Sequence, residues 1–209
     1  MNSAFDVFLT FLVVIDPIGL VPMFGALTAG TSREYRRQMA VKGVLIAALV
    51  LLFFAIMGFA LLHVLGIGLA AFRIAGGALL FLLAIDMVFA RHSGLRSTTA
   101  RETQEARARA DISVFPLAIP LIAGPGAMTT LLLMLQAAHG RPGAVAAVLG
   151  ILGLVLALAL GVLLLSGRIL AWMGETGANV VTRLLGVLLT ALAVQFILTG
   201  IRLGLLMRP

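Results

Sequence analysis

The sequence predicts an all-α membrane protein, a polytopic bundle of six spans made of two inverted three-helix repeats with broken helices 1 and 4. Of its 209 residues, 62% are hydrophobic and only 11% are charged. A soluble domain of this size cannot bury so much apolar surface. Apolar stretches of about 20 residues, the length that crosses a bilayer as a helix, recur along the chain. They lie at roughly 4–27, 40–63, 69–90, 113–137, 143–166 and 178–205.

Basic residues flank these spans unevenly, and this predicts how the spans are oriented, because cytoplasmic loops carry the excess of Lys and Arg. The odd-numbered loops hold Arg33, Arg36, Arg37, Lys42, Arg91, Arg96, Arg101, Arg107, Arg109 and Arg168. The opposite side holds Arg73, Arg141, Arg202 and Arg208. We therefore expect both termini on the periplasmic side of the inner (plasma) membrane. The net charge of +7 then reflects contact with the lipid bilayer and not with nucleic acid.

The most polar stretch divides the chain into halves 1–90 and 113–209, joined by a predicted cytoplasmic connecting loop at 91–112. Each half holds three spans, and an odd number of spans inverts the second half relative to the first. Secondary transporters commonly have this inverted-repeat arrangement. The alternative is chance similarity between segments rich in Leu, Ala and Gly.

Rare residues support the repeat. Arg73 and Gly76 open the third span as Arg183 and Gly186 open the sixth. Pro17 lies 56 residues before Arg73, and Pro125 lies 58 residues before Arg183.

The first and fourth spans are each interrupted near the middle, by Asp16-Pro17-Ile18-Gly19 and by Ala123-Gly124-Pro125-Gly126. A residue that can cap a helix, followed by proline, is a helix-start signal. We therefore expect each span to break and restart there, leaving unpaired amides and a partial positive charge in mid-membrane. Lipid cannot satisfy such groups, so they must face protein or a wet cavity.

Two facing helix starts predict a site for a small zwitterion. The amides after Gly124, Pro125 and Gly126 would hold a carboxylate, and the hydroxyls of Thr129 and Thr130 would add contacts. Asp16, with Pro17 and Gly19 in its turn, would balance an ammonium group or carry a coupling proton. The alternative is a pair of proline kinks in which Asp16 serves only as a cap.

Few other polar residues lie within the spans. Asp86 lies in the third span and Gln195 in the sixth, and an acid within a span is costly enough to suggest function. Arg73 and Arg183 either reach the headgroups or hold the half-helices in place. Gly76 and Gly186 are expected to allow close helix packing.

Three motifs together resemble the MarC family of six-span inner-membrane proteins, in order and over essentially the whole chain. They are the run from Asp16 to Pro22, the run from Arg73 to Gly77, and the run from Pro116 to Pro120 continued by the run from Gly124 to Met128. The resemblance implies relatedness to small neutral amino acid transporters. It favours Asp16, Pro17, Gly19, Gly124, Pro125 and Gly126 as the residues of the substrate pathway.

The sequence thus predicts a secondary transporter that moves small neutral amino acids, of the glycine, alanine, serine or threonine kind, by alternating access. A proton on Asp16 is the preferred coupling ion, since a buried carboxyl group avoids desolvation by staying neutral; sodium is the other. The alternatives are a cation or metal-ion transporter and a non-transporting membrane scaffold. No enzyme activity, cofactor or resident metal is expected, because His63, His92 and His139 lie near different span ends. The oligomeric state is left open.

Overall fold

A computed structural model describes residues 3–89 and 111–206, and these residues form helices and turns with no strand. The helices are α1 (Ala4–Ile15), α2 (Leu20–Leu27), α3 (Arg33–Val64), α4 (Leu69–Phe89), η1 (Ser113–Ile122), α6 (Pro125–Ala137), α7 (Pro142–Leu164) and α8 (Ser166–Leu206). The all-α membrane fold is confirmed. Five spans are long and apolar enough to cross a bilayer, and the bent pair of η1 and α6 makes a sixth if it is counted as one span.

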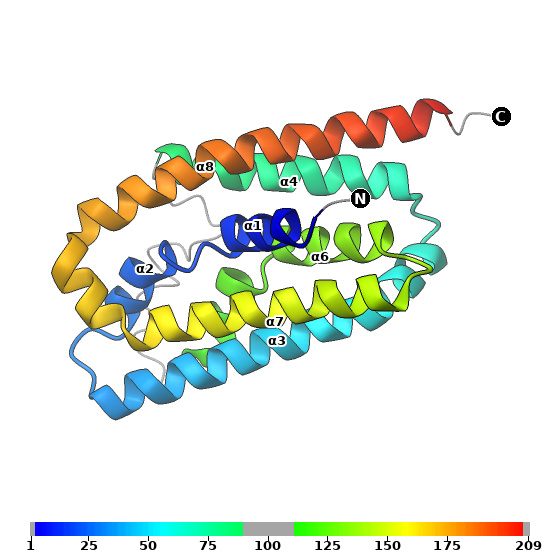
Figure 1. Cartoon of the computed structure of the whole chain (residues 1–209). Helices are drawn as coiled ribbons and strands as arrows, with labels where there is room; N and C mark the ends of the chain where they lie inside the picture. The colour runs from blue at the N-terminus through cyan, green and yellow to red at the C-terminus, as the bar shows by residue number, and fades with distance from the viewer. Residues whose placement is uncertain (1–2, 90–110, 207–209) are drawn as a thin grey trace.

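The helices form three layers (Figure 1). One outer layer is the antiparallel pair α4 and α8, and the other is the pair α3 and α7. The broken helices lie between them: α1 packs on α6 and α7, α2 on α8, α6 on α3 and α4, and η1 on α3. The two interrupted spans therefore occupy the interior of the bundle, and α3, α4, α7 and α8 surround them.

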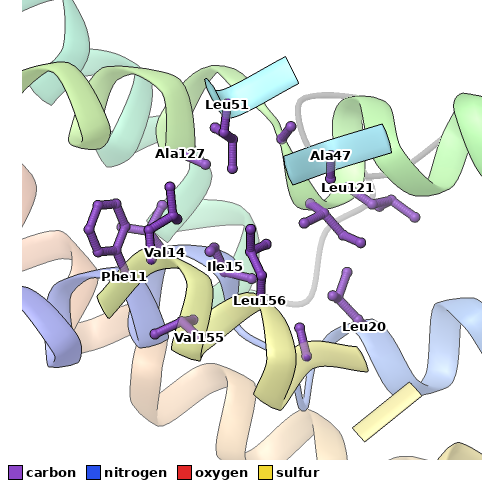
Figure 2. Packing of buried hydrophobic residues seen from close by; sticks show 14 of the residues in the cluster. Phe11, Val14, Ile15, Leu20, Ala47, Leu51, Leu121, Ala127, Val155 and Leu156 are labelled. Carbon is purple, nitrogen blue, oxygen red and sulfur yellow. The ribbon is translucent and has the colours of Figure 1, made fainter. Parts of the chain in front are cut away.

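The core between the layers is apolar and includes side chains from both sides of each break (Figure 2). Ile15 and Leu20 flank the first break, and Leu121 and Ala127 flank the second. The outer surface is apolar too: Phe53 and Ile56 of α3 are 61% and 69% exposed. Apolar groups exposed over whole helices suit a surface covered by lipid.

The boundaries of α4 and α7 lie within two residues of the predicted spans, and two other predictions need correction. Helix α3 begins at Arg33 and not near residue 40, because the Ser32 hydroxyl accepts the Tyr35 amide (3.1 Å) and caps the helix there. Arg33, Arg36, Arg37 and Lys42 thus belong to a helix and not to a loop. The predicted connecting loop lies outside the described residues except for Asp111 and Ile112.

Helix α8 is longer than the predicted sixth span and bends at Gly174, which has φ 65° and ψ 174°. Only glycine adopts this conformation readily. The bend separates the segment 166–173 from the span that follows it. The first segment reaches α2, where Leu170 Cδ2 would lie 3.4 Å from a β-carbon on Gly25.

Candidate functional site: two broken helices

Asp16 is the central residue of the first break. It is fully buried, and its φ is 46°. Its amide closes α1 by donating to the Leu12 carbonyl (2.9 Å). Its carboxylate Oδ1 accepts the amide of Gly19 (3.0 Å), and its own carbonyl accepts the amide of Leu20 (3.3 Å). Asp16 therefore ends one helix and organises the turn from which α2 begins.

The new helix begins later than the sequence predicted. Pro17, Ile18 and Gly19 form the turn, and α2 starts at Leu20 with Gly19 at its N-cap. Proline was expected as the first helical residue. Instead, Pro17 lies within the turn. Its fixed φ follows the left-handed backbone of Asp16, and the Asp16 carboxylate caps the Gly19 amide.

The second break joins η1 to α6 with a bend of 54°. Gly124 is the N-cap of α6, in extended conformation (φ −77°, ψ 172°), and Pro125 is the first helical residue. The sequence predicted an ordinary helix for the segment before Gly124, and this prediction is wrong in detail. Phe115 and Ile119, each preceding a proline, have extended backbone, and the remaining hydrogen bonds span five residues, as from Ala123 to the Ala118 carbonyl (2.8 Å). Proline disfavours helical geometry in the residue before it, which accounts for both interruptions.

A pocket opens at the start of α6. Its empty volume is about 360 Å³ when the space at its open side is included. Within this volume there is room for only one or two water molecules. Its lining is the second break together with apolar side chains of α1 and α4, namely Val14, Leu79, Leu83, Pro120, Leu121, Ile122, Gly124, Pro125, Gly126 and Ala127.

The first turn of α6, from Pro125 to Ala127, lines this pocket. Met128 is the first residue of the helix to donate backwards, to the Gly124 carbonyl (3.1 Å). The amides of Gly126 and Ala127 therefore have no acceptor within the helix. They carry the positive end of the helix dipole, which suits an anion. A β-carbon on Gly124 would lie 2.5 Å from the Pro120 carbonyl oxygen, so this position tolerates no side chain.

The two breaks approach each other through apolar contacts. A β-carbon on Gly126 would lie 3.7 Å from Val14 Cγ1, two residues before Asp16. Figure 2 shows Val14 and Ile15 in the same cluster as Leu121 and Ala127. Asp16 itself does not line the pocket at α6. The sequence predicted the acid and the amides of α6 in one polar pocket, whereas in the structure Asp16 lies outside the pocket that Gly126 and Ala127 line.

The two threonines of α6 have different surroundings. Thr129 packs on α4, where a β-carbon on Gly76 would lie only 1.8 Å from its Cγ2. Thr130 is fully buried, and its hydroxyl oxygen has no hydrogen-bond partner within residues 3–89 and 111–206. Thr130 is therefore a polar group inside the bundle that a bound molecule could satisfy.

The residues predicted to support the site are dispersed. Arg73 reaches α6, where its Nη2 donates to Gln136 Oε1 (2.8 Å). Asp86 is half-buried near the end of α4, and Gly186 packs against Met87 of that helix. The structure does not bring the other two to the breaks, since Arg183 and Gln195 are exposed on α8.

Sequence analysis missed two polar residues. Gln136, in the last turn of α6, is the partner of Arg73. Thr182 of α8 lies beside the first break, and its hydroxyl oxygen is buried with no hydrogen-bond partner among the described residues. Each lies beside a residue far away in sequence, so no local pattern points to it.

The first span is broken at Asp16 and the fourth at Gly124-Pro125-Gly126. The motifs at these breaks can be compared with those of known proteins. The family model described as MarC family integral membrane protein matches residues 1–205. The chain belongs to the MarC family.

Relatives of this MarC-family protein align over nearly their whole length. The UPF0056 membrane protein YvbG of Bacillus subtilis is 36% identical, over 94% of this chain and 92% of its own. The UPF0056 membrane protein MJ1677 of Methanocaldococcus jannaschii is 37% identical over 92% and 93%. The UPF0056 inner membrane protein YhgN of Escherichia coli is 35% identical over 97% and 98%. No solved structure matches.

Proposed function

We propose that this MarC-family protein is a secondary transporter that moves small neutral amino acids across the inner membrane by alternating access. One observation carries the proposal: a half-helix, α6, begins inside the bundle at a pocket lined by its own first turn, whose amides have no acceptor within the helix, and the first break nearby buries the carboxylate of Asp16. Discontinuous helices that meet near the midplane are how many transporters bind their solutes.

The solute's carboxylate would bind the amides of Gly126 and Ala127, where the dipole of α6 is positive. Its short side chain would lie against Val14, Leu79 and Leu83, which form the apolar wall. Thr130 would offer its hydroxyl one turn along α6. Asp16, which lies outside this pocket, would supply the negative charge at the neighbouring first break. The narrow pocket suits a solute of few atoms and must widen to admit it.

Widening is the expected result of one half moving against the other. The contacts between halves support an inverted repeat, because they come in exchanged pairs: α1 packs on α7 as η1 packs on α3, and α2 packs on α8 as α6 packs on α4. Rocking of two such halves would open the central site to each side in turn. We propose both termini on the periplasmic side, on the basis of the distribution of basic residues.

The test is uptake of labelled glycine, alanine, serine and threonine into proteoliposomes, with imposed proton and sodium gradients. Wild-type protein should transport at least one of these solutes. Asp16→Asn should abolish uptake, and Gly124→Leu should reduce it at least tenfold, because the new side chain collides with Pro120. Gly150→Leu is the matched control, since a β-carbon there meets nothing within 4 Å.

Three results would count against the proposal in folded protein. Selective movement of a divalent cation without amino acid uptake would make the protein a cation transporter. No movement of any solute would leave a membrane scaffold. Uptake that Gly124→Leu does not change would remove α6 from the pathway.

A further inference from the structure

Thr182 stands out among the buried polar groups near the first break. Its Oγ1 is buried and has no hydrogen-bond partner in the described part of the chain. This oxygen would lie 2.9 Å from a β-carbon on Gly19, so it faces the turn between α1 and α2. A buried hydroxyl without a partner costs free energy unless something binds it.

The carboxylate of Asp16 faces the same place. Its Oδ2 would lie 2.1 Å from that β-carbon, while its Oδ1 accepts the Gly19 amide. The absence of a side chain on Gly19 thus leaves Asp16 Oδ2 and Thr182 Oγ1 on one side of the turn. They are close enough for one small cation or one water molecule to touch both.

The backbone at this point is also negative. Helix α1 ends at Ile15, so the negative end of its dipole lies here. In a continuous helix the amide of residue 17 would donate to the Val13 carbonyl. Pro17 has no N–H, so the Val13 carbonyl does not receive this hydrogen bond. Carbonyls at the C-terminal ends of half-helices are typical ligands of coupling cations in transporters.

The ligand set selects the cation. All the atoms are oxygens, which favours a hard ion. One carboxylate balances a single positive charge, whereas calcium and magnesium usually take several carboxylates or waters. Within residues 3–89 and 111–206 there is no group of three His, Cys, Asp or Glu residues that could hold a metal ion.

We infer that Asp16 and Thr182 bind a monovalent cation, sodium, at the first break, so that the two broken helices divide the work between a cation and the solute carboxylate. Sodium takes the place of the proton that the sequence favoured. The role of the ion in coupling rests on the proposed function, but its binding does not.

Binding is therefore tested without any solute, by thermal unfolding of the purified protein in detergent. Sodium chloride is compared with potassium chloride and choline chloride at equal ionic strength. At a sodium concentration about tenfold above Kd, the Tm of the wild type should rise by about 3–6 °C. Thr182→Val and Asp16→Asn should lose this rise, and Thr182→Ser should keep it.

Thr190→Val is the matched control, because the Thr190 hydroxyl already donates to the Gly186 carbonyl of its own helix (2.8 Å). It should respond to sodium as the wild type does. If Thr182→Val does not fold, loss of the sodium response in Thr182→Ala carries the same test. A wild type that sodium stabilises no more than potassium does, or a Thr182→Val variant that still responds, overturns the inference.

The two proposals fail in different ways. Sodium-specific stabilisation without amino acid uptake would keep the ion site and remove the proposed function. Uptake that is equally fast with and without a sodium gradient, in protein that sodium does not stabilise, would keep the proposed function and remove the ion site.

Discussion

Arg73 of α4 donates a hydrogen bond to Gln136 of α6 across 63 positions of sequence. Its Nε is buried and has no acceptor among the described residues. Gln136 lies in the last turn of α6, so the guanidinium is close to the negative end of the half-helix whose positive end faces the pocket. The bond therefore fixes α6 to α4 at the end opposite the proposed solute site.

Replacing Gln136 tests this attachment. Gln136→Leu removes the acceptor of Arg73 Nη2 and leaves the partly buried guanidinium without its hydrogen bond to α6. We expect a loss of about 1–3 kcal/mol in the free energy of unfolding, seen as a lower Tm in detergent. Gln195→Leu is the control, because Gln195 is exposed and its side-chain amide donates to Thr199 of its own helix (3.4 Å). Equal stability of the two variants would mean that the Arg73–Gln136 bond contributes nothing.

Gly76 of α4 packs against Thr129 of α6, and this contact gives a second prediction. Gly76→Ala places a methyl group on Thr129 Cγ2, so the helices must separate, at a cost of about 1–3 kcal/mol. Thr129→Ser removes that Cγ2 and keeps the hydroxyl. The double variant should therefore recover part of the lost Tm.

A glycine in open space is the control for this pair. Gly150→Ala in α7 meets nothing within 4 Å and should leave the Tm unchanged or slightly raised, since alanine favours a helix. Additive losses in the double variant would show that Gly76 and Thr129 do not limit the approach of the helices.

These contacts show where sequence reasoning ends. Span positions follow from hydropathy, and the restart at Gly124-Pro125 follows from local chemistry, so α4, α7 and the start of α6 were predictable. Contacts such as Arg73 with Gln136 join distant segments, and helical periodicity does not specify partners across such a separation. The irregular η1 had a local signal in the two prolines at 116 and 120, since proline disfavours helical geometry in the preceding residues, Phe115 and Ile119.

The bend in α8 yields a third prediction. Gly174→Ala forces a side chain into a backbone conformation that essentially only glycine adopts, at a cost of about 1–3 kcal/mol. We expect a lower Tm than in the wild type. Gly153→Ala, in a regular part of α7 with no neighbour within 4 Å, should have no such effect. An unchanged Tm in Gly174→Ala would indicate that α8 can straighten without loss of packing.

The entrance to η1 gives a prediction about pH. Asp111 accepts hydrogen bonds from the Ser113 hydroxyl and the Ser113 amide (2.8 Å) and pairs with Lys42 (3.2 Å). These contacts, those from Ser113 first, hold the pKa of Asp111 below its ordinary value. A carboxyl group whose pKa is lower in the folded state stabilises the fold above its unfolded pKa, and the stabilisation is lost as the pH falls through the folded value.

Asp111→Asn should therefore lower the Tm at pH 7 and make little difference at low pH, where the wild-type carboxyl group is protonated. The effect is small, about 0.2–1 kcal/mol, because both side chains of the ion pair are 47% exposed and water screens them. Lys42→Met should reproduce only part of it, since Ser113 still donates to the carboxylate. Thermal unfolding at the two pH values measures the difference. A Tm difference between wild type and Asp111→Asn that is the same at both would separate the effect from ionisation and assign it to the capping geometry alone.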